Sequence, residues 1–415
     1  MYKLKKGVND VGLRPAEILL PNVPDMTSFS CIACDQFTGD KKFWQTFENS
    51  VKGKPTALDL IFPEVYLSDE PEKRIEKINA NIEKYLKDGV FKKLDEGFIL
   101  TVRSTPFVKR RIGIIGALDL DKYEYGKKTE TLIRATEGVI EERIPPRLKI
   151  RENAPVEFPH VMVLYDDEKK QIAEHYYEIR ESLEKLYDFE LSMGGGRVEG
   201  YFIKDVDDVI KRFSELLTPE RLKSKYGKVD NFAFAVGDGN HSLATAKAHW
   251  ERVKKTLSEK ERENHPARYA LAEFNNVYDE GIYFEPIFRF VSGVNANDFI
   301  VGAKEKDFGD AIIYCGGKEI KLNGKNELPQ GISAADEYIK DFVSKNGGEV
   351  DYIHGESQLK QMVDGDENAF GILFKKLKKE DLFRYVSEKG SFPKKTFSMG
   401  EGIEKRYYIE GRKIK

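Results

Sequence analysis

The spacing of hydrophobic positions changes several times along the chain, and each spacing predicts one kind of element. Over residues 69–95, apolar side chains such as Ile75 and Ile78 recur every three or four positions, which predicts a helix. Asp69 is placed to cap its first turn. The spacing of apolar positions also predicts helices over residues 168–188, 205–218 and 241–257. It predicts strands over residues 98–103, 110–118, 231–236, 267–275 and 282–291. We therefore expect an α/β protein of the mixed α+β type.

The length of the chain predicts more than one domain. With 415 residues, it exceeds the usual size of a single hydrophobic core. The periodic pattern breaks near residues 292–296, where small and polar residues gather around Gly293. We therefore predict a large N-terminal portion, residues 1–292, and a smaller C-terminal portion, residues 293–415.

Composition and charge exclude several classes of partner. The chain is 40% hydrophobic and 33% charged, which is typical of a globular protein, and 68 basic against 71 acidic residues leave a net charge of -3. This balance gives no general attraction to nucleic acid or to an acidic membrane. No apolar stretch follows the basic start, so we expect neither a signal peptide nor a membrane span. We predict a cytoplasmic protein; its oligomeric state is not predicted.

The cysteines fit the same compartment. The chain has three, an odd and small number that suits a reducing cytosol. Cys31 and Cys34 form a C-x-x-C pair, but zinc would need two more ligands and no second pair is present, so we expect two inert buried thiols. Asp35 and Gln36, which follow them, are expected to line a pocket. His160 leads into an apolar strand and is expected to be structural.

An apolar strand that runs into a glycine-rich turn and then a helix is the strongest candidate for chemistry. Residues 232–236 lead into Gly237–Ser242 (Gly-Asp-Gly-Asn-His-Ser), and an alanine-rich helix follows. Glycines let a ligand approach the backbone, and the free N–H groups of a helix N-terminus attract phosphate. Asp238 could then hold Mg²⁺ or act as a base, and His241 could donate to a phosphoryl oxygen. The alternative is a turn that only caps a structural helix.

A second stretch, residues 132–151, is rich in arginine. Glu137 is set among these arginines and is a candidate general base. If residues 147–151 are extended, Arg147, Lys149 and Arg151 share one face, and three cations on one face suit a di- or triphosphate. The alternative is a solvated strand face with surface ion pairs.

A third stretch lies near the C-terminus. Residues 392–400 gather two lysines and two hydroxyl groups around a predicted turn, where Lys395, Thr396 and Ser398 could clasp a phosphate. No phosphate-binding loop of the G-x-x-x-x-G-K-[ST] type occurs in the chain. The glycine run 194–196 is expected to be a hairpin loop.

Several of these pieces together resemble a known family, family 1015 of the domains of unknown function. The matching pieces are Ala33–Thr38, Arg134–Gly138, Arg143–Arg147, Gly237–Ser242, Phe284–Arg289 and Lys395–Gly400, and they span nearly the whole chain. Residues 238–242 also resemble the Asp-Gly-His-x-Arg signature of ParB-like and sulfiredoxin-like nucleotide-binding domains, whose relatives include free L-serine kinases. Asn240 and Ser242 depart from that signature, which has His and Arg there, and Phe288 stands where many relatives carry His.

The resemblance implies a ParB/sulfiredoxin-like nucleus and phosphoryl transfer to free L-serine or a similar small hydroxyl compound, with ATP, ADP or pyrophosphate as donor. Such a reaction needs aligned phosphates, a divalent ion and a base near the acceptor. Glu137 would be the base, and Asp238 would orient Mg²⁺, with Glu137 as a second ligand, or would itself be the base. The remaining expected roles are donor and phosphate binding by Arg134, Arg143, Arg147, Lys149, Gly239, Asn240, His241, Ser242, Lys395, Thr396 and Ser398, and acceptor binding by Asp35, Gln36 and Arg289.

Two other functions use the same pocket. A ParB-like nucleotidase or regulator that depends on nucleic acid would want a helix-turn-helix and a basic face, and the charge balance indicates neither. A non-catalytic sensor of a nucleotide or metabolite needs many of the same residues, and the sequence leaves that alternative open.

Overall fold

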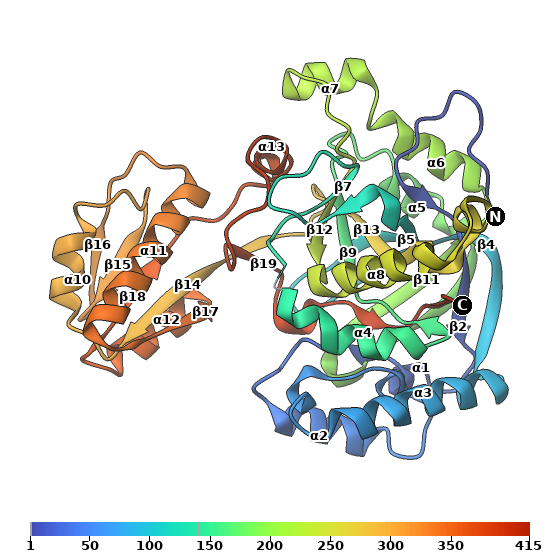
Figure 1. Cartoon of the computed structure of the whole chain (residues 1–415), viewed down its shortest axis with the longest axis horizontal. Coiled ribbons are helices and arrows are strands. Elements are labelled where there is room, and N and C mark those ends of the chain that lie inside the picture. The colour runs from blue at the N-terminus through green and yellow to red at the C-terminus, as the bar shows by residue number, and fades with distance from the viewer. Residues whose placement is uncertain (1, 140) are drawn as a thin grey trace. The chain divides into compact units, whose positions relative to one another are not determined.

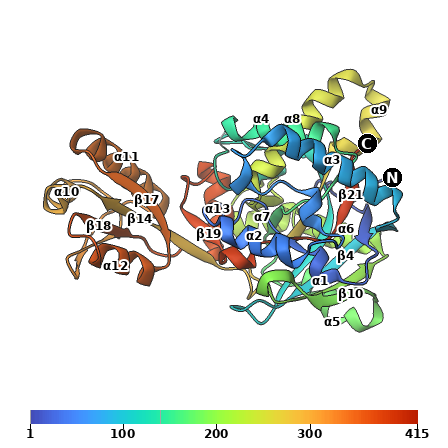
Figure 2. The ribbon, with the colours of Figure 1, turned by 90° about the horizontal axis from the view of Figure 1, so that it is seen from below.

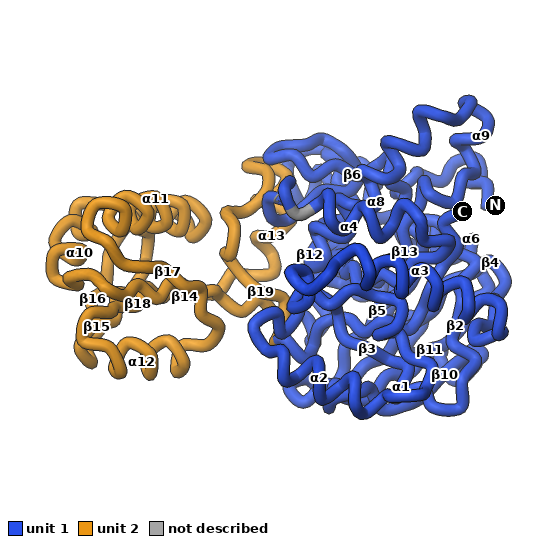
Figure 3. Tube along the Cα trace, turned by 60° about the horizontal axis from the view of Figure 1, so that its bottom comes forward, with its two compact units in different colours: residues 1–282, 402–415 blue, residues 283–401 orange. Residues whose placement is uncertain are grey.

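The structure is a computed structural model, and it describes residues 2–139 and 141–415. The chain divides into two compact units (Figure 3). Unit 1 consists of residues 1–282 together with residues 402–415, and unit 2 consists of Tyr283–Glu401. Unit 1 is therefore discontinuous along the chain. The boundary expected from the sequence, between residues 292 and 293, falls within unit 2, at the end of a strand.

Unit 1 is built around one large mixed sheet, which confirms the predicted fold class. The strands run in the order β6 (Tyr123–Glu124), β7 (Ile133–Ala135), β12 (Phe234–Asp238), β9 (Met162–Tyr165), β13 (Tyr269–Asn276), β5 (Arg111–Asp119), β4 (Phe91–Arg103), β2 (Ala16–Pro21), β21 (Gly411–Lys413) and β8 (Val156–Glu157). Off this path, β1 (Leu13–Arg14) pairs with β5, and β11 (Arg197–Ile203) pairs with β4 and with β10 (Glu184–Glu190). The pairs β6–β7, β7–β12 and β9–β13 are parallel.

The central strand β5 has a hydrophobic core on each side. Every residue of β5 is buried, which explains its continuous apolar run. Ile112 and Ile114 point into a core that also holds Trp250, whereas Ile115 and Ala117 point into the opposite core. Helices therefore cover both faces of the sheet.

The helices of unit 1 fall into two groups. The helices of the first core are α5 (Ala173–Glu178), α6 (Val206–Glu215), α7 (Pro219–Tyr226) and α8 (Asn240–Val253), and those of the second are α1 (Met26–Phe29), α2 (Lys41–Ser50) and α3 (Pro71–Lys87). The last group lies along one side of unit 1 (Figures 1 and 2). A short helix, α9 (Glu259–Asn264), follows α8. Within the described ranges, every helix is too short or too polar to cross a membrane.

Several predicted elements are confirmed, and two boundaries move. The strands at β4, β5, β12 and β13 and the helices α6 and α8 form where the periodicity predicted them. The helix expected over residues 69–95 ends at Lys87, because β4 begins at Phe91, and its N-cap is Glu70 instead of Asp69. The prediction of one helix over residues 168–188 is wrong for the second half of this range.

That second half forms a strand because it has a strand partner. Only α5 and a short 3₁₀ turn, Arg180–Ser182, are helical, and residues from Glu184 onward form β10. β10 pairs antiparallel with β11, and the glycine run 194–196 lies in the connection between them, as expected. Tertiary pairing thus overrides a local helical preference.

The expectation of an extended chain over residues 147–151 is wrong, because these residues belong to the helix α4 (Ile144–Asn153). Pro145 and Pro146 stand in its first turn, where backbone N–H groups have no helical partner and proline is tolerated. Ile144 and Leu148, four positions apart, are buried against the protein, and α4 packs on α8. The three cations therefore do not form one row.

The last residues of the chain return to unit 1 and are held there by strand pairing. β20 (Tyr407–Tyr408) pairs with β3 (Cys31–Ile32), and β21 is hydrogen-bonded between β2 and β8. This segment connects the loop after β3 with the end of the sheet formed by β2, β21 and β8. It also brings residues near position 405 beside the junction of β12 and α8.

Unit 2 contains its own sheet and core. The sheet runs in the order β16 (Lys318–Lys321), β15 (Ile312–Cys315), β18 (Ala369–Leu373), β14 (Phe284–Ser292) and β17 (Glu349–His354), and β19 (Phe397–Met399) also pairs with β14. Its helices are α10 (Ala296–Ala303), α11 (Leu328–Asn346), α12 (Glu356–Asp364) and α13 (Lys379–Lys389). The main core of the unit gathers around Phe299 and Phe370.

Candidate functional site

Two predicted carboxylates lie at or just beyond the ends of neighbouring parallel strands. β7 and β12 pair in parallel, with Ala135 opposite Val236. The next residue, Thr136, donates from its hydroxyl to the carbonyl oxygen of Val236 at 2.6 Å. Glu137 follows β7, and Asp238 is the last residue of β12, so both lie at the carboxyl ends of these neighbouring strands. Carboxyl ends of parallel strands are common positions for ligand sites in α/β proteins.

The helix α8 begins directly at this edge. Its N-cap is Gly239, whose φ of 77° lies in the left-handed region that glycine favours. A Cβ atom there would lie 3.0 Å from the Cα atom of Val161, so a larger residue would clash. Asn240 starts the first turn, and the first backbone N–H groups of a helix have no partner within it. This end of α8 therefore offers hydrogen-bond donors and the positive end of the helix dipole.

The remaining residues of the junction continue this first turn. His241 and Ser242 are both half-buried, and the carbonyl oxygen of His241 accepts a hydrogen bond from the hydroxyl of Thr245. The Asn240 Oδ1 atom is buried, and within the described part of the chain it has no hydrogen-bond partner. A buried acceptor without a partner is costly, so the side chain of Asn240 is suited to receive a donor from a ligand or a water.

A buried lysine that the sequence did not suggest faces Asp238. The Nζ atom of Lys405 lies 3.3 Å from Oδ2 of Asp238, while Oδ1 accepts a hydrogen bond from the N–H of Gly239 at 3.0 Å. Only 6% of Lys405 is exposed. The charge of Lys405 also stabilises the ionised form of Asp35. The ammonium group therefore lies close to two carboxylates at the start of α8.

Asp35 belongs to a second group of polar side chains in the site. Its Oδ2 atom is 3.5 Å from Nε2 of His160, and its Oδ1 atom accepts a hydrogen bond from the amide of Gln36 at 3.0 Å. Burial alone would raise the pKa of Asp35. The charge and hydrogen bond of His160, together with Gln36 and Lys405, outweigh burial and hold the pKa well below its usual value. Asp35 is thus an anion at neutral pH.

His160 is held in place by a chain of hydrogen bonds. The N–H of Cys34 donates to the hydroxyl of Tyr408 at 3.1 Å, and that hydroxyl is 2.8 Å from Nδ1 of His160. Burial raises the pKa of Tyr408 well above its usual value, so the phenol keeps its proton at neutral pH. Its hydrogen bond with Nδ1 and the carboxylate of Asp35 near Nε2 hold the ring of His160 in place. The expectation that His160 is structural stays a prediction.

The two cysteines of the C-x-x-C pair lie behind this chain. Cys31 is buried in β3, Cys34 is half-buried, and both are free thiols. Burial raises the pKa of both groups, to about 12 for Cys34. Both thiols therefore stay protonated at neutral pH, where a thiol is a poor nucleophile.

A mostly apolar cavity of about 150 Å³ opens beside the first turns of α8. Ser242, Thr245, His160 and Tyr408 form its polar end. The apolar walls come from α3, α4, the loop before α3 and the residue after β8, with Ile61, Phe62, Leu67, Ile82, Ile150 and Phe158. Arg147 also lines the cavity and forms an ion pair with Glu64. The cavity thus joins an apolar compartment to the polar groups around Gly239.

Two other predicted donor-binding residues of unit 1, Arg134 and Lys149, have protein partners. Arg134 is buried and makes a two-pronged ion pair with Asp230, with distances of 2.5 and 3.1 Å. Lys149 is exposed on α4, and its Nζ atom is 3.8 Å from Glu72. Arg143 ends a short 3₁₀ turn, and its side chain lies outside what the structure describes. The donor-binding roles of these residues stay predictions.

The predicted residues of unit 2 form a compact group of their own. Arg289 is fully buried, contacts both carboxylate oxygens of Asp336 at 2.7 Å and donates to the carbonyl oxygen of Lys395. Lys395 is exposed and has a φ of 57°. The hydroxyl of Thr396 donates to the carbonyl oxygen of Pro393, and that of Ser398 to the carbonyl oxygen of Gly400. Their roles in donor and acceptor binding also stay predictions.

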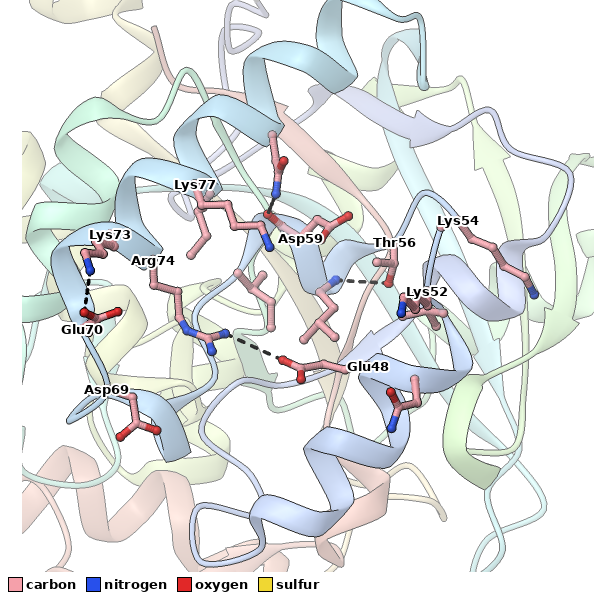
Figure 4. Close-up of a pocket in the computed structure, with 17 residues that line it drawn as sticks. Glu48, Lys52, Lys54, Thr56, Asp59, Asp69, Glu70, Lys73, Arg74 and Lys77 are labelled. Carbon is pink, nitrogen blue, oxygen red and sulfur yellow. Dashed lines mark hydrogen bonds and ion pairs between the residues drawn. The ribbon is translucent and has the colours of Figure 1, made fainter.

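A larger hollow of about 700 Å³ between α2 and α3 has a different character (Figure 4). It is lined by five basic and four acidic side chains, among them Lys73, Arg74, Glu48 and Glu70. Arg74 lies 3.8 Å from Glu48, and Lys73 lies 2.6 Å from Glu70. Because its charges are nearly balanced and pair with one another at the surface, this hollow has no preference for an anion.

The fold and these groups define a mixed α/β protein with a candidate ligand site at a strand-to-helix junction. A family model described as "Protein of unknown function (DUF1015)" matches residues 13–381. The chain therefore belongs to this family, as its motifs indicated. No curated protein gives a significant sequence match.

Solved structures with a similar fold are distant. A conserved hypothetical protein from Pyrococcus furiosus is 10% identical with a TM-score of 0.36, over 71% of this chain and 93% of that chain. A free serine kinase in complex with AMP is 8% identical with a TM-score of 0.39, over 72% and 91%. SbnI with a C-terminal truncation, from Staphylococcus aureus, is 9% identical with a TM-score of 0.35, over 69% and 82%. At these values the similarities carry no argument about activity.

Proposed function

We propose that this protein is a small-molecule phosphotransferase that transfers a phosphoryl group to the hydroxyl of free L-serine or a similar small compound. One observation carries the proposal: Glu137 follows β7 and Asp238 ends the neighbouring parallel strand β12, where the N-terminus of α8 and the buried ammonium of Lys405 supply positive charge. Phosphoryl transfer needs this combination of a base, anion-binding groups and a carboxylate for a metal ion.

In the proposed reaction, Glu137 accepts the proton of the acceptor hydroxyl. The freed oxygen forms a bond to the terminal phosphorus of the donor, and the bond from that phosphorus to the leaving phosphate oxygen breaks. Gly239, Asn240, His241 and Ser242 surround the transferred group at the start of α8. Asp35 and Gln36 bind the acceptor, whose ammonium group suits the ionised carboxylate of Asp35.

The carboxylates of the junction fit a magnesium ion that is shared with the substrate. Mg²⁺ is usually bound through one or two carboxylates together with phosphate oxygens of the substrate. Asp238 and Glu137 would be its protein ligands, and the ion would neutralise charge on the donor phosphates. Within the described ranges, no group of three or more acidic, His or Cys side chains is arranged to hold a metal alone. This arrangement favours a metal that arrives with the donor.

The apolar cavity favours a donor that carries a ring. ATP, ADP and pyrophosphate are all candidate donors, but pyrophosphate has nothing to place in an apolar compartment. A cavity of roughly 150 Å³ with apolar walls can hold a ring the size of benzene. The cavity measured here has about this volume and meets the first turn of α8 at Ser242. We therefore favour a nucleotide, with its base in the cavity and its phosphates at the helix N-terminus.

A screen of donors against acceptors tests the proposal. ATP, ADP and pyrophosphate would each be incubated with L-serine and related hydroxyl compounds in the presence of Mg²⁺, with phosphorus NMR as the readout. We expect a new phosphomonoester signal with L-serine and a nucleotide. Binding of a donor without transfer to any acceptor would reject the kinase and favour a sensor of the same ligand.

A further inference from the structure

Lys405 lies in a loop whose backbone is held by several buried hydrogen bonds. The guanidinium of Arg103 is buried and donates to the carbonyl oxygens of Gly195, Ile403, Glu404 and Lys405 at 2.7–3.0 Å. Arg111 donates to the carbonyl oxygen of Glu404 at 2.9 Å. Burial and the charge of Arg111 lower the pKa of Arg103 to about 9, so holding this loop has an electrostatic cost.

The residues that follow Lys405 are fixed as firmly. Arg406 is buried between Glu273 and Glu410, each at 2.7 Å, and its carbonyl oxygen accepts a hydrogen bond from the N–H of Ala33. Tyr408 contacts His160 at 2.8 Å. Lys405 therefore projects from a firmly held segment, which places its ammonium group beside Asp238.

This location is unfavourable for a lysine with only a structural role. The N-terminus of a helix carries partial positive charge, so a cation placed beside it is repelled. The ammonium group is nevertheless 3.3 Å from Asp238, the residue that precedes the N-cap of α8. A buried charge also loses its hydration, and nearby carboxylates compensate only part of that loss. Asp238 lies between the ammonium group and the helix N-terminus, and a phosphoryl anion would supply further negative charge at the same place.

We propose that Lys405 is a catalytic residue that contacts the transferred phosphoryl group. This inference rests on the proposed function and assigns a role that the sequence did not suggest. Lys405 keeps its proton throughout. Its ammonium group donates hydrogen bonds to phosphoryl oxygens, whose charge is redistributed while the bond to the acceptor oxygen forms and the bond to the leaving group breaks. In the absence of the anion, Asp238 takes its place as the partner of Lys405.

The test compares Lys405→Met and Lys405→Arg with Lys413→Met, an exposed lysine on the same segment. Calorimetry would measure the binding of ATP and of pyrophosphate, and phosphorus NMR would measure transfer to L-serine. We expect Lys405→Met to weaken binding of both anions by ~10- to 100-fold and to lower the transfer rate by about 10²- to 10³-fold. Lys405→Arg should recover part of the binding, and Lys413→Met should match the wild type.

A measurement on the wild-type protein covers the case that Lys405→Met does not fold. Lysine acetylation followed by mass spectrometry should show that pyrophosphate slows the labelling of Lys405 and leaves that of Lys413 unchanged. Equal labelling of Lys405 with and without pyrophosphate would overturn the inference.

The two proposals fail in different ways. If Lys405→Met binds and transfers like the wild type, the role of Lys405 is wrong and the kinase stands. If the wild type binds ATP or pyrophosphate but phosphorylates no acceptor, the kinase is wrong, and a loss of binding in Lys405→Met still supports the anion contact. If the wild type binds neither anion, both proposals are rejected.

Discussion

Asp35 and His160 face each other in the candidate site, with Oδ2 of the carboxylate 3.5 Å from Nε2 of the imidazole. The two residues lie 125 positions apart in the sequence (160 − 35), yet the chain Cys34–Tyr408–His160–Asp35 is continuous. The carboxylate is held ionised, as the lowered pKa of Asp35 indicates. This pair links the loop after β3 to the junction of β12 and α8.

The pair should make stability depend on pH in acid. The pKa of Asp35 is lower in the folded state than its value of about 3.9 in an unfolded chain. Its contribution is therefore complete above pH 4 or so and is lost as the pH falls toward the folded-state pKa. Urea unfolding between pH 6 and pH 3 should show that the free-energy difference between wild type and Asp35→Asn shrinks in acid. The exposed Asp95, changed to Asn, is the control, and a difference that grows in acid would contradict the prediction.

Replacing the predicted base should separate chemistry from binding. Glu137→Gln keeps the shape of the side chain and removes its basicity, so the transfer rate should fall by ~10²- to 10⁴-fold. Affinity for the donor should change little, because the anion is held by α8 and Lys405. Initial rates and calorimetry on the same samples measure the two quantities. Wild-type turnover by Glu137→Gln would shift the role of base to Asp238, and Asp238→Asn would then carry the larger loss.

Filling the cavity should distinguish a nucleotide from pyrophosphate. Leu67 lines the cavity and is half-buried, whereas its neighbour Ser68 is exposed. Leu67→Trp should weaken the binding of ATP by about tenfold or more, since roughly 1.4 kcal/mol of lost contact gives that factor, and should leave pyrophosphate binding unchanged. Ser68→Trp should affect neither ligand. Equal loss of both ligands in Leu67→Trp would indicate damage to the site as a whole.

Removing the support of Lys405 should loosen the end of unit 1. Arg103→Met removes a donor from four carbonyl oxygens, of which that of Glu404 keeps the donor Arg111. The buried groups left unpaired cost about 2–4 kcal/mol in total. The free energy of unfolding should fall by this amount, and limited proteolysis should cut within residues 402–415 more readily. Arg197→Met, which removes a half-exposed arginine, should cost about 1 kcal/mol or less. If Arg103→Met resists proteolysis as fully as the wild type, Arg103 does not hold this segment in place.

Local pattern was enough to predict the elements that place the main loop of the site. The apolar run before Gly237 and the alanine-rich helix after it fixed β12 and α8, and β4 and β5 were equally clear. The pattern failed where a partner strand or a proline decides the conformation. Residues 184–190 form a strand because β11 is available, and residues 144–153 form a helix in which prolines occupy the permissive first turn.

The part of the site around Lys405 and Tyr408 could not be predicted from the local sequence pattern. Lys405 and Tyr408 lie in or beside a two-residue strand, β20, which is too short to show a periodicity. They belong to the candidate site through contacts to Asp238 and His160, far away in the sequence. The one signal in the sequence was the run Lys-Arg-Tyr-Tyr itself, residues 405–408, which places two cations beside two large aromatic residues. Such a run is unusual for a solvated chain end and indicates burial among carboxylates.

Because unit 1 is discontinuous along the chain, it cannot be completed early in synthesis. Residues 402–415 leave the ribosome only after all of unit 2 has been made, because unit 2 interrupts unit 1 along the chain. Until then β21 is missing between β2 and β8, and the candidate site lacks its buried ammonium group. A nascent chain that ends before residue 402 therefore contains Glu137 and Asp238 but cannot assemble the complete candidate site. Synthesis of residues 402–415 thus completes both the sheet and the site.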